Sequence, residues 1–153
     1  MKVALGADHA GFPLKDFVGQ AIEALGHHVV DCGTDSELPV DFPDIVESTC
    51  IPVLKGEVDR AVLICGSGAG AVMAANKMRG IRCALVHEPY SAHQCVEHDD
   101  ANVIAMGNWL VGRALVPDIL QAFFDARFDD DEETRRRVAK MHDLEIRFGS
   151  VDD

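Results

Sequence analysis

The sequence lacks any run of about 18 to 20 apolar residues, the length that a helix needs to span a bilayer. Its first residues, MKVALGADHAG, pass directly into a strand-like pattern, without the charged segment and cleavage site of a secretory leader. No repeat, linker or low-complexity segment interrupts the 153 residues, of which 48% are hydrophobic. We therefore expect one soluble, unprocessed domain over residues 1–153.

Positive charge is also scarce, because 14 Lys and Arg stand against 26 Asp and Glu, for a formal net charge of −12. Such a field repels polyanions, so we expect no nucleic-acid partner and no docking on an anionic membrane. A phosphorylated metabolite is still compatible with this charge if Arg, His and backbone N–H groups form a local pocket for it.

Cysteine pairs are missing as well. The five cysteines are odd in number, widely spaced and without a CxxC motif: Cys32, Cys50, Cys65, Cys83 and Cys95. This spacing predicts free thiols in a reducing cytoplasm rather than a zinc site or a redox dithiol. Any single cysteine is by default a small buried apolar residue, so a chemical role must be argued from its neighbours.

What the chain does contain is a regular alternation of short β-rich runs with helical patterns. The β-rich runs are residues 2–5, 29–32, 61–65, 83–86 and 102–106. This order predicts βαβ units, and hence an α/β fold with a five-stranded parallel sheet covered on both faces. The clearest helix has Pro13 in its first turn and stops at Gly26. Pro52 and Pro117 each predict a kink or a late helix start.

The last helical pattern, residues 132–148, carries a narrow apolar stripe among many charges. The stripe consists of Val138, Met141, Leu144 or Glu145, and Phe148. A stripe this thin favours docking on a partner over sealing a core, so we expect a C-terminal helical arm.

A glycine-rich turn follows the third β-rich run, with the sequence Cys65-Gly66-Ser67-Gly68-Ala69-Gly70-Ala71. Glycines at a strand-to-helix turn expose several N–H groups at a helix N-terminus, where they can bind an anion or a developing oxyanion. A tight structural turn is the simpler interpretation of the same residues. They also satisfy the dinucleotide pattern GxGxxA, with Glu88 placed to hold a ribose, although that pattern usually follows the first strand. The sequence has no GK[ST], which excludes a P-loop.

Cys65 stands at the C-terminal tip of its predicted strand, where ligands collect in open α/β sheets. A helix N-terminus stabilises a thiolate, so this residue could serve as a base or a nucleophile. Asp8 and His9 follow the first predicted strand and should lie at the same edge of the sheet, and His98, before the fifth, has a similar claim. Each of these side chains could equally belong to a solvated turn, and His87 is ambiguous.

Several segments together resemble the ribose-5-phosphate isomerase B family, which includes galactose-6-phosphate isomerase subunits and allose-6-phosphate isomerases. These segments are ADHAGFPLK, VVDCGT, VDFPD, AVLICGSGAGAVMAANKMRGIRCALVH, PYSA and EHDDANVIAMG, and they occur in the family's order. The resemblance implies a Rossmann-like three-layer α/β/α fold and an aldose–ketose isomerase. It further implies a homodimer or dimer of dimers that works without metal or cofactor.

The resemblance also implies roles for individual residues. Cys65 resembles the base that moves a proton between C1 and C2, and Ser67 a hydroxyl residue beside the enediolate. His98 resembles the residue that opens the sugar ring, with Asp8 assisting. The remaining candidates bind substrate: the backbone from Gly66 through Gly68 and Ala69 to Gly70 as the oxyanion cradle, His9 at the phosphate, then Asp99, Asn102, Arg113 and Arg137.

The chain departs from the family pattern around the expected phosphate site. Asp99 replaces the common Asn and adds negative charge beside the sugar. Trp109, in Gly107-Asn108-Trp109, and Glu133, in DEETRRRV, stand where phosphate-binding arginines are expected, while Arg137 matches. Arg113 and Arg136 are extra cations. The tail EETRRRVAKMHDLE resembles that of galactose-6-phosphate isomerase B-type subunits.

These observations leave three hypotheses. The first is an isomerase, with ribose 5-phosphate to ribulose 5-phosphate in the pentose phosphate pathway as the first choice, and galactose or allose 6-phosphate or a tetrose 4-phosphate as alternatives. The second is a nucleotide-binding module that uses the GSGAGA turn. The third is a catalytically silent subunit, which the joint presence of Cys65, Ser67, His98 and Asp8 disfavours.

Overall fold

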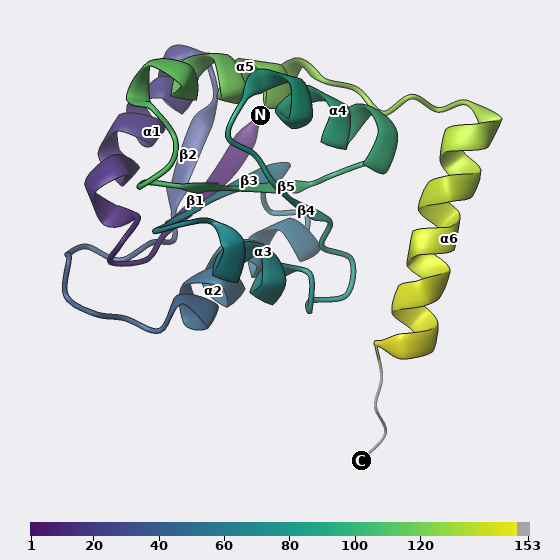
Figure 1. Ribbon diagram of the computed structural model, residues 1–153, viewed down its shortest axis with the longest axis horizontal. Helices are drawn as coiled ribbons and strands as arrows, with labels where there is room; N and C mark the ends of the chain where they lie inside the picture. The colour runs from purple at the N-terminus through teal and green to yellow at the C-terminus, as the bar shows by residue number, and fades with distance from the viewer. Residues whose placement is uncertain (150–153) are drawn as a thin grey trace.

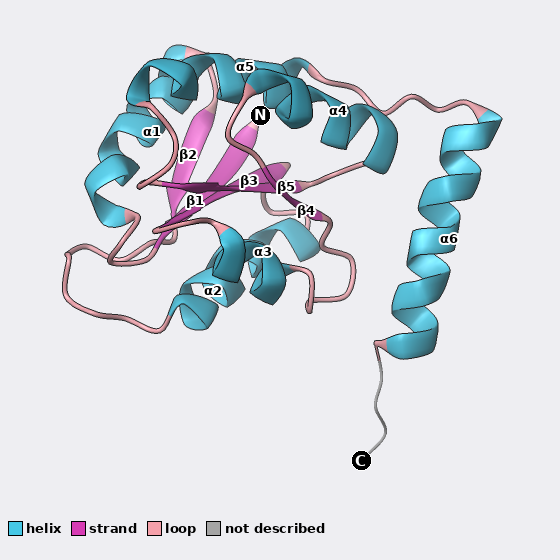
Figure 2. Ribbon diagram, viewed as in Figure 1, coloured by secondary structure: helices cyan, strands magenta, loops and turns pink. Residues whose placement is uncertain are grey.

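A computed structural model of the protein describes residues 1–149. Its centre is a parallel sheet with the strand order β2-β1-β3-β5-β4 (Figures 1 and 2). The strands are β1 Lys2–Ala7, β2 His28–Asp31, β3 Arg60–Cys65, β4 Cys83–Leu85 and β5 Val103–Gly107. The predicted α/β fold with five parallel strands is thus confirmed. The prediction of one domain over residues 1–153 includes 150–153, which lie outside the described residues.

Helices cover both faces of the sheet, which makes three layers (Figure 1). Helices α1 (Phe12–Ala24), α4 (Pro89–Asp99) and α5 (Val116–Asp125) pack on one face, and α2 (Phe42–Leu54) and α3 (Ala69–Ala75) on the other. A short 3-10 turn, η1 (Arg113–Leu115), leads into α5. Strands β1, β3 and β5 are buried along nearly their whole length, which explains their continuous apolar runs.

Prolines and glycines lie at the start, within and after the end of the helices. Pro13 lies in the first turn of α1, and Gly26, with φ of 79°, follows its end. Pro117 lies in the first turn of α5, in agreement with the predicted late start. Pro52 lies within α2, close to the end of that helix at Leu54. Pro52 has no N–H to donate to the Ser48 carbonyl, and α2 ends two residues later.

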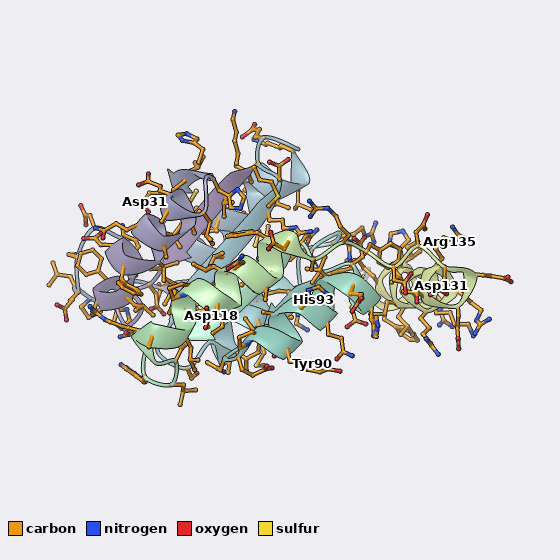
Figure 3. All side chains as sticks on the ribbon, turned by 90° about the horizontal axis from the view of Figure 1, so that it is seen from above. Asp31, Tyr90, His93, Asp118, Asp131 and Arg135 are labelled. Atoms are coloured by element: carbon orange, nitrogen blue, oxygen red, sulfur yellow. The ribbon has the colours of Figure 1, made fainter. Side chains whose placement is uncertain are left out.

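Helix α6 (Glu132–Phe148) extends away from the three layers. Seen from above, the helix that follows Asp131 and carries Arg135 stands apart from the layer with Tyr90, His93 and Asp118 (Figure 3). It is tied to the body by a hydrogen bond from the Gly80 N–H to Glu145 Oε1 at 2.8 Å. A groove of about 700 Å³ separates it from the segment before β4, with Arg79, Ile81 and Arg82 on one wall and Met141, Leu144 and Phe148 on the other. The helix has the predicted bounds, while its docking on a partner stays a prediction. No helix among residues 1–149 has both the length and the apolar character that a membrane crossing requires.

Candidate active site

The glycine turn between β3 and α3, which we call the cradle (residues 65–70), encloses the Cys65 thiol. Gly68 adopts φ of 83°, a left-handed conformation that bends the chain back from the strand into the helix. In this bend the Gly68 N–H donates to Cys65 Sγ at 2.9 Å, and Cys65 is 7% exposed. The thiol is therefore held at the end of β3 with a backbone donor on its sulfur, which is a suitable partner for the charge of a thiolate.

The same turn presents further donors to a ligand. The first helical bond of α3 runs from the Val72 N–H to the Gly68 carbonyl at 3.1 Å, so the N–H groups of Gly70 and Ala71 precede it. Ser67 is exposed, and its hydroxyl oxygen accepts from the Ala69 N–H at 3.3 Å. An oxygen that develops negative charge beside Cys65 would meet these groups.

The segment after β5 continues alongside the cradle. Cys65 is in register with Gly107, the Asn108 N–H donates to the Cys65 carbonyl at 2.8 Å, and the Trp109 N–H donates to the Gly66 carbonyl at 3.1 Å. The Trp109 ring lies so close to Gly66 that a Cβ there would be 2.6 Å from the ring. Gly66 is thus required for this close approach.

The side chains of Asn108 and His87, for which the sequence predicts no role, fix this edge of the sheet. The Asn108 Nδ2 donates to the Ala10 carbonyl at 2.9 Å and so joins the β5 end to the loop after β1. His87 Nε2 accepts from the Gly107 N–H at 3.0 Å, which makes Nδ1 the protonated nitrogen of the neutral ring. Their position directly after a strand was the available signal for both.

Asp8 and His9 lie at the same edge as Cys65, as the sequence predicted. The Asp8 N–H donates to the carbonyl of Ile64 at 3.2 Å, and Asp8 Oδ1 accepts from the Gly11 N–H at 2.8 Å, with Asp8 only 7% exposed. His9 Nδ1 accepts from the Val40 N–H at 3.3 Å, which anchors its ring to the loop before α2.

Arg113 also lies at this edge, beside the start of α1. Its Nη2 donates to the Pro13 carbonyl at 3.0 Å, and its guanidinium lies 5.6 Å from the centre of the Phe17 ring. This places one cation next to the loop that carries Asp8 and His9.

His98, Asp99 and Asn102 lie at the opposite edge of the sheet, so the expectation that His98 shares an edge with Cys65 within one chain is wrong. Helix α4 begins after β4 and returns the chain to the start of β5, as every parallel crossover must. The Asn102 carbonyl accepts from the Ala61 N–H, and Cys65 lies four positions after Ala61 in β3, roughly 13 Å along the strand.

The surroundings of these residues differ from those of the cradle. The His98 side chain is 51% exposed, with Nε2 3.8 Å from a carboxylate oxygen of Glu97. The Asn102 amide is engaged in the fold, because its Oδ1 accepts from the Arg82 N–H at 2.9 Å and its Nδ2 donates to the Gly80 carbonyl at 2.9 Å.

Arg137 is likewise not brought to the cradle by its own chain. It lies on α6, its side chain is 64% exposed, and its guanidinium is paired with the Glu133 carboxylate one helical turn earlier. The pairing partner is the same residue that replaces an expected arginine.

The other thiols are unsuited to act as a base. Burial raises the pKa of Cys50 to about 12 and that of Cys95 to about 11, and burial also raises the pKa of Cys83. Burial, followed by the charge of Asp31, also raises the pKa of Cys32. Among residues 1–149, no three His, Cys, Asp or Glu side chains gather in a way that could hold a metal ion.

A cysteine within a glycine cradle at the carboxyl edge of a parallel sheet is the arrangement of an open α/β enzyme with its ligand site at the strand ends. Over residues 3–141 the chain matches the Ribose/Galactose Isomerase family. The chain therefore belongs to that family, and it is a sugar phosphate isomerase.

Similar proteins extend over almost the whole chain. Ribose-5-phosphate isomerase B of Escherichia coli is 39% identical over 135 residues, which cover 88% of this chain and 91% of that protein. A 4-deoxy-4-sulfo-D-erythrose isomerase from a Clostridium species is 35% identical and covers 92% of this chain and 89% of its own. The structure of Clostridium thermocellum ribose-5-phosphate isomerase B superimposes with a TM-score of 0.93 at 37% identity, covering 97% of this chain and 99% of that one.

Proposed function

We propose that the chain interconverts an aldose phosphate and its ketose, with ribose 5-phosphate and ribulose 5-phosphate as the first-choice pair. The observation that carries the proposal is the Cys65 thiol at the end of β3, with the Gly68 N–H on its sulfur and further N–H donors in the same turn. The name of the Escherichia coli relative supports ribose 5-phosphate, and that of the clostridial relative supports a four-carbon sugar as the alternative.

The reaction follows from the chemistry of these groups. The Cys65 thiolate removes the proton from C2 of the open-chain aldose, and the electron pair of that C–H bond forms the double bond of an enediolate, with its negative charge on O1. The cradle N–H groups stabilise this oxygen, and the exposed Ser67 hydroxyl lies in the same turn. The thiol then gives the proton to C1 while the hydroxyl proton moves from O2 to O1, which leaves a ketone at C2.

Ring opening and phosphate binding involve the remaining candidates. We assign the ring oxygen and hydroxyls to Asp8, and the phosphate to His9 and Arg113, which lie at the cradle edge. His98, Asp99, Asn102 and Arg137 can take part only if a second copy supplies them, because their own chain holds them elsewhere. We therefore propose a homodimer, or a dimer of dimers, whose site combines both copies. We place it in the cytoplasm, where a sugar phosphate of the pentose phosphate pathway would be found.

The decisive experiment is an activity screen against aldose phosphates of four, five and six carbons. Cys65→Ala should lower turnover of the best substrate by roughly 10² to 10⁴, because the variant lacks its proton-transferring base. Cys32→Ala is the matched control, since that thiol is half-buried and lies outside the cradle. Near-normal turnover in Cys65→Ala would show that another group is the base.

The nucleotide-binding alternative loses its ribose-binding residue. The Glu88 carboxylate caps α4, where its oxygens accept from the Tyr90 N–H at 2.6 Å and the Ser91 N–H at 2.7 Å. Calorimetric titration with NAD and AMP tests this alternative, and tight binding of either nucleotide would support it.

A further inference from the structure

Trp109 occupies a fixed place directly beside the catalytic turn. It is the only tryptophan of the chain, and it is 73% exposed. Two consecutive backbone hydrogen bonds, from Asn108 to Cys65 and from Trp109 to Gly66, hold its main chain against the cradle. The ring atoms that lie nearest to Gly66 belong to the six-membered ring of the indole.

The exposure of this ring is informative because of where it lies. Single exposed apolar side chains are common and need no explanation. Here, however, the ring lies against the residue next to the catalytic cysteine, and a ligand in the cradle would therefore border it. A tryptophan combines large apolar faces with one N–H donor, which matches the C–H groups and hydroxyls of a sugar.

Two cations near the cradle, Arg113 and Lys15, already have partners within the chain. Arg113 is the arginine at this edge, and it is already engaged with the Pro13 carbonyl and the Phe17 ring. Lys15 is buried and bound to Asp31 at 2.7 Å and to the Thr34 carbonyl at 2.6 Å. Trp109 therefore offers the substrate an apolar contact at an edge of the sheet that has little unpaired positive charge.

We propose that Trp109 is a specificity-determining residue, whose indole packs on the carbon chain of the sugar phosphate bound in the cradle. This inference rests on the proposed function, because it takes the cradle as the substrate site. The contact persists from ground state to transition state, so it acts on the Michaelis constant more than on turnover.

The single tryptophan allows a direct binding test without turnover. Indole emission of Cys65→Ser is followed during titration with ribose 5-phosphate, erythrose 4-phosphate and galactose 6-phosphate, with inorganic phosphate as the control, while calorimetry records binding independently. We expect a saturable change in emission with at least one sugar phosphate, and none with inorganic phosphate. Calorimetric binding that leaves the emission unchanged would overturn the inference, as would an emission change that follows protein concentration and not ligand.

Variants supply the second readout. Trp109→Ala should raise the Michaelis constant of the best substrate roughly tenfold with a smaller change in turnover, whereas Trp109→Phe should retain most of the affinity. Leu110→Ala is the matched control, because Leu110 is the adjacent exposed apolar residue, at 63%. Equal effects of Trp109→Ala and Leu110→Ala would overturn the inference.

The proposed function and the proposed role of Trp109 can be contradicted separately. One outcome is that the wild type turns over no sugar phosphate while the indole emission still reports saturable binding. That outcome contradicts the proposed function and supports the role of Trp109. An active enzyme whose Trp109 variants keep the wild-type constants supports the function and contradicts that role. If the panel is neither bound nor turned over, both are wrong.

Discussion

The five cysteines differ in the surroundings that the fold gives them. Cys50, Cys83 and Cys95 are enclosed by apolar side chains of the two cores, while Cys65 meets a backbone donor at a strand end. The sequence could single out Cys65, because three alternating glycines follow it directly. It could not show that the Gly68 N–H reaches the sulfur, since that contact depends on the left-handed conformation of Gly68.

These buried thiols predict a loss of stability at alkaline pH. The pKa of Cys50 and that of Cys95 are raised from 9.0, to about 12 and about 11 respectively, so in this range the unfolded chain loses these protons more readily than the folded one. The contribution of the protonated thiols is fully present below pH 9 and falls as pH rises toward their folded values. The urea midpoint should therefore decrease between these limits.

A cysteine variant separates this effect from other titrations at high pH. In Cys50→Ala the decrease of the urea midpoint with pH should be smaller than in the wild type, because one of the responsible groups is gone. Parallel curves for the two proteins would contradict the assignment to Cys50.

At the scale of elements, the sequence predicts the strands, whereas the edge of the sheet to which His98 belongs depends on the direction of the α4 connection. Continuous apolar runs identify β1, β3 and β5, because both of their faces are buried. Nearness to β5 in sequence predicts the wrong edge for His98, because a residue that precedes a parallel strand lies at the edge opposite to the C-terminal tip of that strand. The position of Trp109 over Gly66 does not follow from the sequence, since it depends on the hydrogen bonds that Asn108 and Trp109 make to Cys65 and Gly66 beyond the end of β5.

The exposed apolar face of helix α6 predicts that this helix contacts a partner. It exposes Met141 at 40%, Leu144 at 49% and Phe148 at 72%, and it carries Arg137 away from its own cradle. Deletion of the residues after Asp131 should therefore weaken the proposed dimer and raise the Michaelis constant, because an apolar face without cover on its own chain favours a partner surface.

Point variants of α6 test the same prediction without the risk that a truncated chain fails to fold. In the full chain, Met141→Glu should lower the dimer fraction measured by sedimentation, whereas Lys140→Glu, at the exposed position before it, should not.

Arg137→Ala should raise the Michaelis constant by roughly tenfold or more with a smaller loss of turnover. A charge-assisted contact with the phosphate stabilises the bound substrate and the transition state alike. A truncated chain that sediments as the dimer and keeps its constants would refute the arm interpretation.

At the scale of the whole molecule, the two edges of the sheet carry different parts of the candidate site. The carboxyl edge holds the cradle with Asp8, His9 and Arg113, and the amino edge holds His98, Asp99 and Asn102. The net charge of −12 implies that a phosphate needs a local pocket of Arg, His and backbone N–H groups, and Arg113 and His9 lie at the cradle edge. The charge could not reveal that the sheet divides the candidates between its edges.

This division has a genetic consequence. If each complete site takes Cys65 from one copy and His98 from the other, Cys65→Ala and His98→Ala damage different halves of the same site. Two inactive alleles expressed together should then complement one another, because a mixed dimer places both intact residues in one of its two sites, and random pairing restores about a quarter of all sites. Activity no greater than the sum of the separately expressed variants would mean that both residues serve one chain, or that His98 serves none.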